Sequence, residues 1–237
     1  MNHVDRITIY ADRFPTREHF PFSLPVLRET PLLELPTPVT FFVGENGSGK
    51  STLLEAVARR CNIHIWGAEQ WSRAEPNPFE QLLHRYITVH WANGVVPGSF
   101  FAGQFFRRFA ELLDLWAASD PGQLDYFGGK SLVSQSHGEG LMAFFESRYR
   151  IEGLYLLDEP ETALSPKTQL RLLHLLRDMG RAGHAQFLIA THSPILLACP
   201  HATIYNFDAC PIEPVAYHDT EHYRVYKAFM ADPQAHL

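Results

Sequence analysis

Apolar and polar positions along this chain form strand patterns that alternate with helical ones. Residues 4–10 alternate between apolar and polar side chains, as in a strand with one buried face. The runs 39–43, 154–157 and 187–190 are continuously apolar, which is typical of strands covered on both faces, and another strand begins at Ile204. Helical spacing appears in residues 51–60, 105–118, 141–148 and 166–180.

The order of these elements predicts an α/β fold with a mostly parallel central sheet flanked by helices. At 237 residues the chain fits a single domain. Residues 1–61 combine the first strands with many prolines, so an N-terminal antiparallel β portion is expected there. Prolines and glycines interrupt residues 62–150, which indicates an inserted, mostly helical lobe. Residues 151–237 return to alternating strands and helices.

A glycine-rich segment follows the apolar run 39–43 and leads directly into a predicted helix. It fits the pattern G-x-x-x-x-G-K-[ST], in which glycines let backbone N–H groups fold around a polyphosphate. Lys50 would bring a positive charge to the β- and γ-phosphates, and the Ser51 hydroxyl could ligate Mg²⁺. The sequence therefore predicts that the protein binds a nucleoside triphosphate. The predicted phosphate-binding residues are Gly44, Glu45, Asn46, Gly47, Ser48, Gly49, Lys50, Ser51 and Thr52.

Two adjacent acids, Asp158 and Glu159, follow the apolar run 154–157. Ligands of parallel sheets bind at the carboxyl ends of the strands, so Asp158 is well placed to hold Mg²⁺. Glu159 could polarise an attacking water as a general base. Two acids at the end of a wholly apolar strand are costly for structure alone, so we expect a functional role for both.

Two later segments could also contact phosphate. Ser136, Gly138 and Glu139 precede a predicted helix, where a serine hydroxyl and free N–H groups suit an anion. An ordinary helix N-cap explains that pattern equally well. His192 follows a predicted strand, where a histidine can reach a γ-phosphate or order the attacking water, although a lone histidine there is more often structural.

Taken together, the order of these motifs resembles that of the ATP-binding-cassette (ABC) ATPases over residues 39 to 195. The segments 41–55, 135–139, 155–161 and 190–197 look like the stand-alone bacterial predicted-ATPase family, whose AAA-type domain is related to the structural-maintenance-of-chromosomes (SMC) and repair branch. The terminal segment Asp-Thr-Glu-His-Tyr at 219–223 is also similar to that group. The resemblance implies the P-loop NTPase fold of ABC ATPases, with ATP and Mg²⁺ as cofactors and hydrolysis of ATP to ADP and phosphate.

In this superfamily two subunits enclose two ATP molecules head to tail, so the resemblance implies a homodimer that forms on ATP binding. It also implies that Asp158 supports the metal, Glu159 is the catalytic base and His192 senses the γ-phosphate. The residues that would contact ATP bound to the partner subunit are Ser136, Gly138 and Glu139.

The superfamily further uses a glutamine that touches Mg²⁺ and the attacking water. Gln104 is the candidate for this catalytic and metal-binding role, and Gln70 and Gln81 are alternatives. His137 occupies the place of a glycine in the usual signature segment, which reduces the freedom of the backbone there. The aromatic side chain that would stack on adenine stays open among Tyr10, Phe20 and Phe22.

Composition limits the partners and the cellular compartment that are expected for this protein. The formal net charge of −6 argues against a surface dominated by nucleic-acid contacts, although it allows a local basic groove. The three cysteines, Cys61, Cys199 and Cys210, lack C-x-x-C spacing, so free thiols in a reducing compartment are expected. The N-terminus lacks the apolar stretch of a signal peptide, and no run approaches the ~18 apolar residues of a membrane helix. We therefore expect a soluble, cytoplasmic protein.

The process that ATP hydrolysis would drive is a separate question. The first interpretation is a switch for a nucleic-acid or effector-protein partner, although relatives of that kind usually carry long coiled coils and no heptad run appears in this sequence. The alternative is the ATPase subunit of an ABC membrane transporter, whose aromatic-rich 62–150 lobe would dock a permease helix. A small-molecule kinase would share the P-loop, but the signature segment and His192 argue against it.

Overall fold

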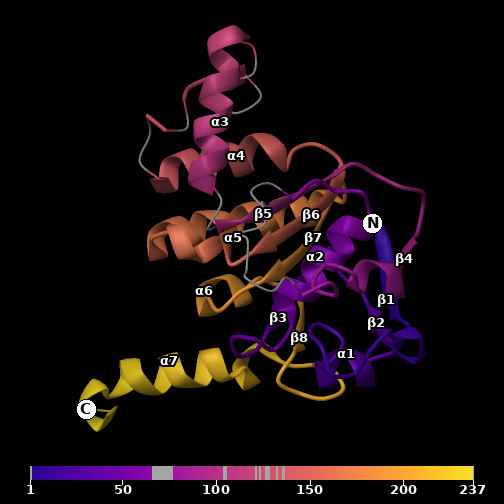
Figure 1. The fold of residues 1–237 in the computed structure, drawn as a ribbon. Coiled ribbons are helices and arrows are strands. Elements are labelled where there is room, and N and C mark those ends of the chain that lie inside the picture. Colours follow the sequence, from indigo (N-terminus) through magenta and orange to yellow (C-terminus); the bar gives the residue numbers. More distant parts are fainter. Residues whose placement is uncertain are drawn as a thin grey trace.

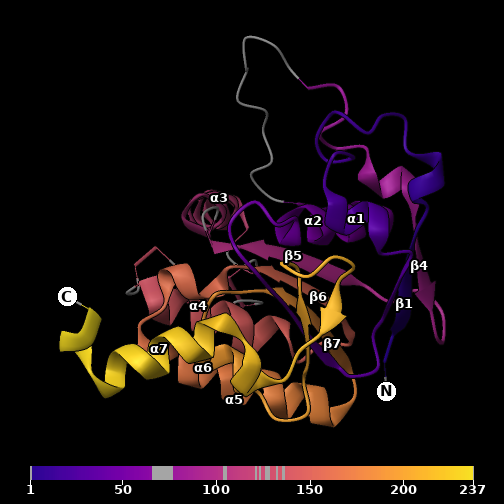
Figure 2. The same ribbon diagram turned by 90° about the horizontal axis from the view of Figure 1, so that it is seen from below.

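The computed structural model describes residues 2–65, 77–103, 106–120, 122, 124–125, 129–131, 133–134 and 137–236. Their strands form a six-stranded and a three-stranded sheet, and helices cover both faces of the larger one (Figures 1 and 2). The α-helices are α1 (Pro25–Glu29), α2 (Lys50–Arg60), α3 (Phe106–Ser119), α4 (His137–Arg148), α5 (Pro166–Ala182), α6 (Pro194–Leu197) and α7 (Glu221–Ala231). Short 3-10 helices are η1 (Ala11–Arg13), η2 (Leu83–Tyr86), η5 (Pro160–Ala163), η6 (Tyr217–Asp219) and η7 (Pro233–His236).

The six-stranded sheet confirms the predicted mostly parallel core. Its strands run in the order β5-β6-β7-β3-β8-β9, and only β9 pairs antiparallel with its neighbour among the described strands. Every residue of β3, β6 and β7 is buried, as their continuous apolar runs require. The strands are β3 (Val39–Val43), β5 (Gly98–Ala102), β6 (Gly153–Asp158), β7 (Ala185–Ala190), β8 (Thr203–Asn206) and β9 (Glu213–Pro214).

The three-stranded sheet confirms the antiparallel N-terminal portion. Strand β1 (Val4–Ile9) lies between β2 (Leu32–Glu34) and β4 (Ile87–Trp91). The fully buried Gln186 of β7 ties this sheet to the larger one, because its Oε1 accepts hydrogen bonds from the backbone N–H groups of His3 and Val4, at 2.9 and 2.7 Å. Its Nε2 donates to the Val4 carbonyl at 2.8 Å. The amide thus satisfies three buried backbone groups that would otherwise be costly.

Two clusters of apolar side chains fill the space on the two faces of the large sheet. Helix α2 buries Leu53, Leu54 and Val57 in one cluster, and α5 buries Leu172 and Leu176 in the other. Ser165 caps the start of α5 and its Oγ accepts a hydrogen bond from the Thr168 N–H, while Gly183, in a left-handed conformation, caps the end of the helix. These end signals explain why the amphipathic pattern becomes a helix between those two residues.

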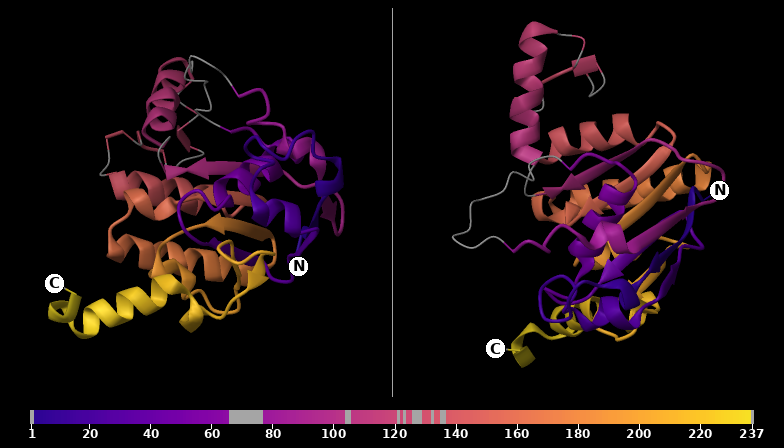
Figure 3. Two further views of the ribbon diagram at one scale, coloured as in Figure 1. Left: turned by 60° about the horizontal axis from the view of Figure 1, so that its bottom comes forward. Right: turned by 45° about the vertical axis from the view of Figure 1, so that its right-hand side comes forward.

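The described residues of 62–150 include two strands besides helices. Strand β4 at 87–91 belongs to the three-stranded sheet and β5 at 98–102 to the six-stranded sheet, and the α-helices of the described part of this segment are α3 and α4. Helix α3 then stands away from the sheet (Figures 1 and 3). These two strands are five residues long and follow prolines or turns closely, which makes their pattern weak in the sequence.

Helix α7 also leaves the body, and none of its residues is buried (Figure 1). Val225, Tyr226, Phe229 and Met230 leave 55%, 55%, 44% and 76% of their surface exposed. No helix among the described residues is long and apolar enough to cross a bilayer.

The three cysteines are free and differ in exposure. Burial raises the pKa of Cys61 to about 12 and that of Cys199 to about 11, whereas Cys210 is exposed. These two thiols are therefore protonated near neutral pH, which makes them poor nucleophiles.

Candidate functional site

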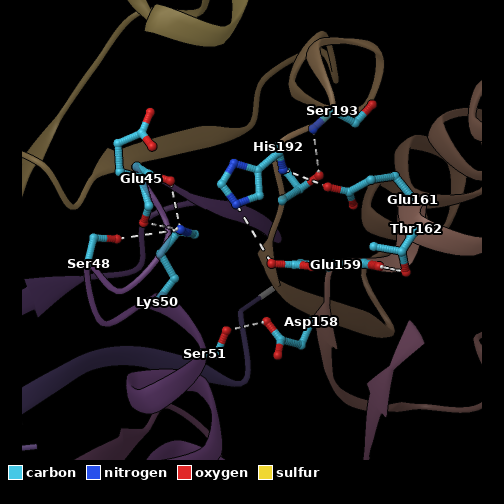
Figure 4. Close-up of polar contacts among 12 residues, drawn as sticks. Glu45, Ser48, Lys50, Ser51, Asp158, Glu159, Glu161, Thr162, His192 and Ser193 are labelled. Carbon is cyan, nitrogen blue, oxygen red and sulfur yellow. Dashed lines mark hydrogen bonds and ion pairs between the residues drawn. The ribbon is translucent and has the colours of Figure 1, made fainter. Parts of the chain in front are cut away.

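The register of the parallel strands brings the predicted site residues to one edge of the large sheet. Asp158, the last residue of β6, pairs with Ala190 of β7 and with Ala102 of β5. The glycine-rich segment 44–52, called the P-loop below, leaves β3 at the same carboxyl edge, next to β7. Figure 4 shows the side chains of Lys50, Asp158 and His192 gathered there.

The P-loop backbone needs its glycines. Gly44, Gly47 and Gly49 have positive φ angles of 144°, 84° and 105°. A Cβ on Gly44 would lie 2.9 Å from Oδ1 of Asp208, and that same oxygen accepts a hydrogen bond from the Glu45 N–H at 2.8 Å. Asp208 therefore orients the start of the loop, a contact that sequence reasoning missed. The signal was available, because Asp208 follows the strand that begins near Ile204, and an acid just after a buried strand marks the ligand-binding edge.

Lys50 is nearly buried, with 4% of its surface exposed. Its Nζ donates to the carbonyls of Gly44 and Glu45 at 2.7 and 2.9 Å and to Ser48 Oγ at 3.4 Å. Burial lowers the pKa of Lys50, although Asp208 and Glu159 oppose that shift. The three donors of the ammonium group thus point into the P-loop, where phosphate oxygens could accept them.

Ser51 and Asp158 form an oxygen-rich pair at the start of α2. Ser51 Oγ donates to Asp158 Oδ1 at 2.8 Å, and Asp158 is 9% exposed. Burial raises the pKa of Asp158 to about 6 and outweighs the Ser51 hydrogen bond, which lowers it. A hydroxyl and a buried carboxylate are hard oxygen donors, so this pair fits Mg²⁺.

Because the pKa of Asp158 is raised, its ionised carboxylate lowers the free energy of unfolding of the nucleotide-free protein above about pH 6. A carboxyl whose folded pKa exceeds the unfolded value stabilises the native state at low pH, and that contribution is lost as pH rises through the folded pKa. Asp158→Asn keeps the Ser51 acceptor but does not ionise. Its advantage in free energy of unfolding over the wild type should therefore grow by about 2.4 kcal/mol between pH 4 and pH 8.

Urea denaturation across that pH range measures this difference. Asp5→Asn, at an exposed position of β1, is the matched control and should follow the wild type. An Asp158→Asn profile parallel to that of the wild type would show that Asp158 does not titrate differently in the folded state.

Glu159 adopts an unusual backbone conformation, with φ 46° and ψ 55°. Its carbonyl accepts hydrogen bonds from the Thr162 N–H at 3.2 Å and from Thr162 Oγ1 at 2.9 Å, which fix the turn. Its Oε1 lies 3.7 Å from His192 Nε2, and the side chain is 40% exposed (Figure 4). Left-handed backbone at a non-glycine residue is strained. Here the Glu159 carboxylate points from the end of β6 toward His192 and the P-loop.

Two hydrogen bonds hold His192 in place. Its backbone N–H donates to Glu161 Oε1 at 2.6 Å, and its ring Nδ1 lies 2.8 Å from His222 Nε2. Its Nε2 is buried and has no hydrogen-bond partner among the described residues. Glu161 and His222 were not predicted as site residues, because they lie 31 and 30 positions from His192 and no local pattern links them.

Two predicted residues, Ser136 and Gln104, lie outside the described residues. Gly138 and Glu139 lie in the first turn of α4, where a Cβ on Gly138 would meet Thr168 of α5 at 3.6 Å. Gly103 lies at the site, since a Cβ there would be 2.9 Å from the Glu159 carbonyl. Of the alternatives to Gln104, Gln70 is also outside the described residues, and Gln81 is an exposed residue just before η2.

Of the three candidates for adenine stacking, Phe22 is wrong. It is fully buried and packs against Phe14 and Tyr86, with ring centroids 4.7 and 5.1 Å apart. Phe20 stays 40% exposed, and the Tyr10 ring carries the Arg13 guanidinium 4.6 Å from its centroid.

Comparisons with known proteins agree with this arrangement. Residues 92–198 match the family described as "AAA domain, putative AbiEii toxin, Type IV TA system", and residues 22–59 match another AAA-domain family. The manganese transport system ATP-binding protein MntA of Synechocystis sp. is 27% identical over 191 residues, covering 72% of this chain and 71% of that protein. The thiamine import ATP-binding protein ThiQ of Cereibacter sphaeroides is 27% identical over 171 residues, covering 64% and 69%.

Solved structures are similar as well. The SMC head domain from Thermotoga maritima has a TM-score of 0.50 and 17% identity, covering 91% of this chain and 100% of that one. CbiO1 from Clostridium perfringens, part of the ABC transporter complex cbiONQ, has a TM-score of 0.53 and 13% identity, covering 99% and 98%. The chain therefore has the P-loop fold shared by ABC ATPases and SMC head domains. Both of these relatives are named as ATP-binding proteins, which agrees with an ABC-type ATPase fold for this chain.

Proposed function

We propose that this protein hydrolyses ATP with Mg²⁺ at the carboxyl edge of its large sheet. The observation that carries the proposal is the convergence there of Lys50, the Ser51–Asp158 pair and the Glu159–His192 pair. Each group suits one part of phosphoryl transfer to water, namely phosphate binding, metal binding and activation of the attacking water.

Each residue has a defined task in this proposal. Residues 44–52 bind the phosphates through backbone N–H groups and the Lys50 ammonium. Ser51, Asp158 and Gln104 would hold Mg²⁺, which when bound offsets negative charge on the phosphates. Glu159 accepts a proton from the attacking water, and His192 donates from Nε2 toward the terminal phosphate.

We further propose that two chains pair head to tail around two ATP molecules. Ser136, Gly138 and Glu139 of one chain would then contact the ATP that is held by the P-loop of the other. The position of Gly138 and Glu139 in the first turn of a twelve-residue helix supports this role, because the N–H groups of a helix start favour anions. The similarity to SMC heads and ABC ATPases supports pairing in general.

Mixing two inactive variants tests the head-to-tail arrangement. Lys50→Ala damages the P-loop of its own chain, and Gly138→Trp would damage the surface offered to the other chain. A mixed pair retains one site with both halves intact, so phosphate release should reappear on mixing although neither variant is active alone. Lys50→Ala mixed with Lys50→Met is the matched control and should stay inactive. No recovery from the first mixture would contradict a composite site.

The partner of this ATPase is proposed to be a nucleic acid or an effector protein in the cytoplasm. The match to a family whose description names a toxin and the SMC-head fold support this choice. The second candidate, an ATPase subunit of a membrane transporter, is supported by the similarity to MntA and ThiQ. Stimulation of phosphate release by DNA or RNA, weakened by salt, would favour the first, whereas co-purification with a membrane protein would favour the second.

A further inference from the structure

The contact between His192 and His222 joins the strand edge to helix α7, to which no catalytic or binding role has been assigned. His222 lies in the first turn of α7, and its Nε2 is 2.8 Å from His192 Nδ1. The two rings lie 5.0 Å apart between centroids, with their planes at 50°. One of these nitrogens must carry a proton and the other a lone pair, so the contact couples the tautomers of the two rings.

Hydrogen bonds hold the first turn of α7 against the segment that carries His192. Thr220 caps the helix, because its Oγ1 accepts from the Tyr223 N–H at 3.3 Å and donates to the Tyr217 carbonyl at 2.8 Å. Tyr217 Oη in turn donates to the carbonyl of Pro194 at 3.1 Å. These hydrogen bonds, which lie outside the P-loop, place His222 beside His192.

His222 also lines a cavity of about 370 Å³ beside Gly44 of the P-loop. Burial lowers the pKa of its imidazole, and His192 and Lys50 lower it further, while Asp208 and Glu221 oppose them. The ring of His222 is therefore neutral near pH 7, with one N–H and one lone pair.

Two proton arrangements are open to this pair of rings. If His192 donated from Nδ1, its Nε2 would present a lone pair to the Glu159 carboxylate, whose Oε1 is 3.7 Å away. Two acceptors would then face each other at the site. If His222 donates from Nε2 instead, His192 carries its proton on Nε2 and directs it toward Glu159 and the P-loop side, which is electrostatically favourable.

We propose that His222 is a positioning residue for ATP hydrolysis, which donates from Nε2 to His192 Nδ1 and so keeps the proton of His192 on Nε2. The inference rests on the proposed ATPase function. His222 would not touch the substrate. It acts through His192, as a group that orients an imidazole by bonding to its far nitrogen.

Substitution of His222 separates this role from packing. His222→Phe keeps the ring but removes the donor, and it should lower kcat about 5- to 20-fold with KM changed less than about twofold. His222→Gln restores an N–H at a similar reach and should recover most of the activity. His218→Phe, in the neighbouring η6, is the matched control at an exposed histidine and should behave as the wild type.

A double-mutant cycle then tests whether His222 acts through His192. In a His192→Ala background, His222→Phe should have no further effect on kcat, because the group that it orients is gone. An equal loss in both backgrounds would overturn the inference, as would a His222→Phe variant with the kcat of the wild type.

The tautomer of His192 can be measured without an assay of catalysis. Ring ¹⁵N chemical shifts of His192 should report protonation at Nε2 in the wild type and a mixture of tautomers in His222→Phe. Identical His192 shifts in the two proteins would overturn the inference even if the wild type is an ATPase. A wild type that releases no phosphate would instead refute the proposed function, while the shift measurement would still decide whether His222 sets the tautomer.

Discussion

Replacing Glu159 with glutamine should reduce ATP turnover by about 10²- to 10⁴-fold while ATP binding stays intact. The change removes a carboxylate that can accept a proton, but it keeps the size of the side chain and an oxygen for hydrogen bonding. Its neighbourhood supports the expectation, since Oε1 lies 3.7 Å from His192 Nε2 and the strained turn directs the carboxylate to the P-loop side. ATP that is bound but not cleaved should then hold two chains together.

Two measurements check this expectation. Single-turnover phosphate release gives the rate of cleavage, and native mass spectrometry with ATP and Mg²⁺ shows whether a dimer with two nucleotides accumulates. Glu152→Gln, at an exposed acid just before β6, is the matched control and should keep wild-type turnover. A Glu159→Gln protein that cleaves ATP at the wild-type rate would refute the role of Glu159 as the base.

Replacing Lys50 with methionine should weaken ATP binding about 10- to 150-fold. A hydrogen bond to a charged group contributes about 1.5–3 kcal/mol, and Lys50 would offer such bonds to phosphate oxygens. Methionine keeps a long side chain in a position that is only 4% exposed, so the loss reflects the charge and its donors more than a cavity. Arginine would not restore binding, because its planar group does not fit where Nζ meets three oxygens of the P-loop.

Isothermal titration of the nucleotide-free protein measures this change in Kd. Lys167→Met, on the exposed first turn of α5, controls for the loss of one positive charge and should bind ATP as the wild type does. Lys50→Met must also unfold in urea at a concentration close to that of the wild type, so that weak binding is not the result of poor folding. Unchanged ATP affinity in a folded Lys50→Met protein would refute the assignment of the P-loop.

The sequence was most informative where local patterns and long-range structure agree. The apolar run at 39–43 became β3, and the glycines at 44, 47 and 49 adopt the positive φ angles that a tight phosphate-binding turn requires. Asp158 and Glu159 could be placed at a strand end because the strand before them is wholly apolar. In each case neighbours in sequence determine the geometry.

Contacts between distant segments could not be predicted in this way. Asp208 reaches Glu45 across 163 positions, and His222 reaches His192 across 30. Neither pair has a spacing that a strand or helix would impose, so only the assembled sheet brings them together. Strand β4 was missed for a similar reason, because its pairing with β1 is decided by the N-terminal segment rather than by its own five residues.

The unequal exposure of the three cysteines has a practical consequence for every experiment on pairing. Cys210 is exposed and lies two residues after Asp208, which bonds to the start of the P-loop. A maleimide dye should therefore label this thiol well ahead of Cys61 and Cys199, whose pKa values are raised by burial, and report on nucleotide binding nearby. In air, the same thiol can cross-link two chains whether or not ATP is present. A dimer that still forms in the presence of reductant and in the Cys210→Ser variant therefore reports pairing by bound nucleotide, and not by a disulfide.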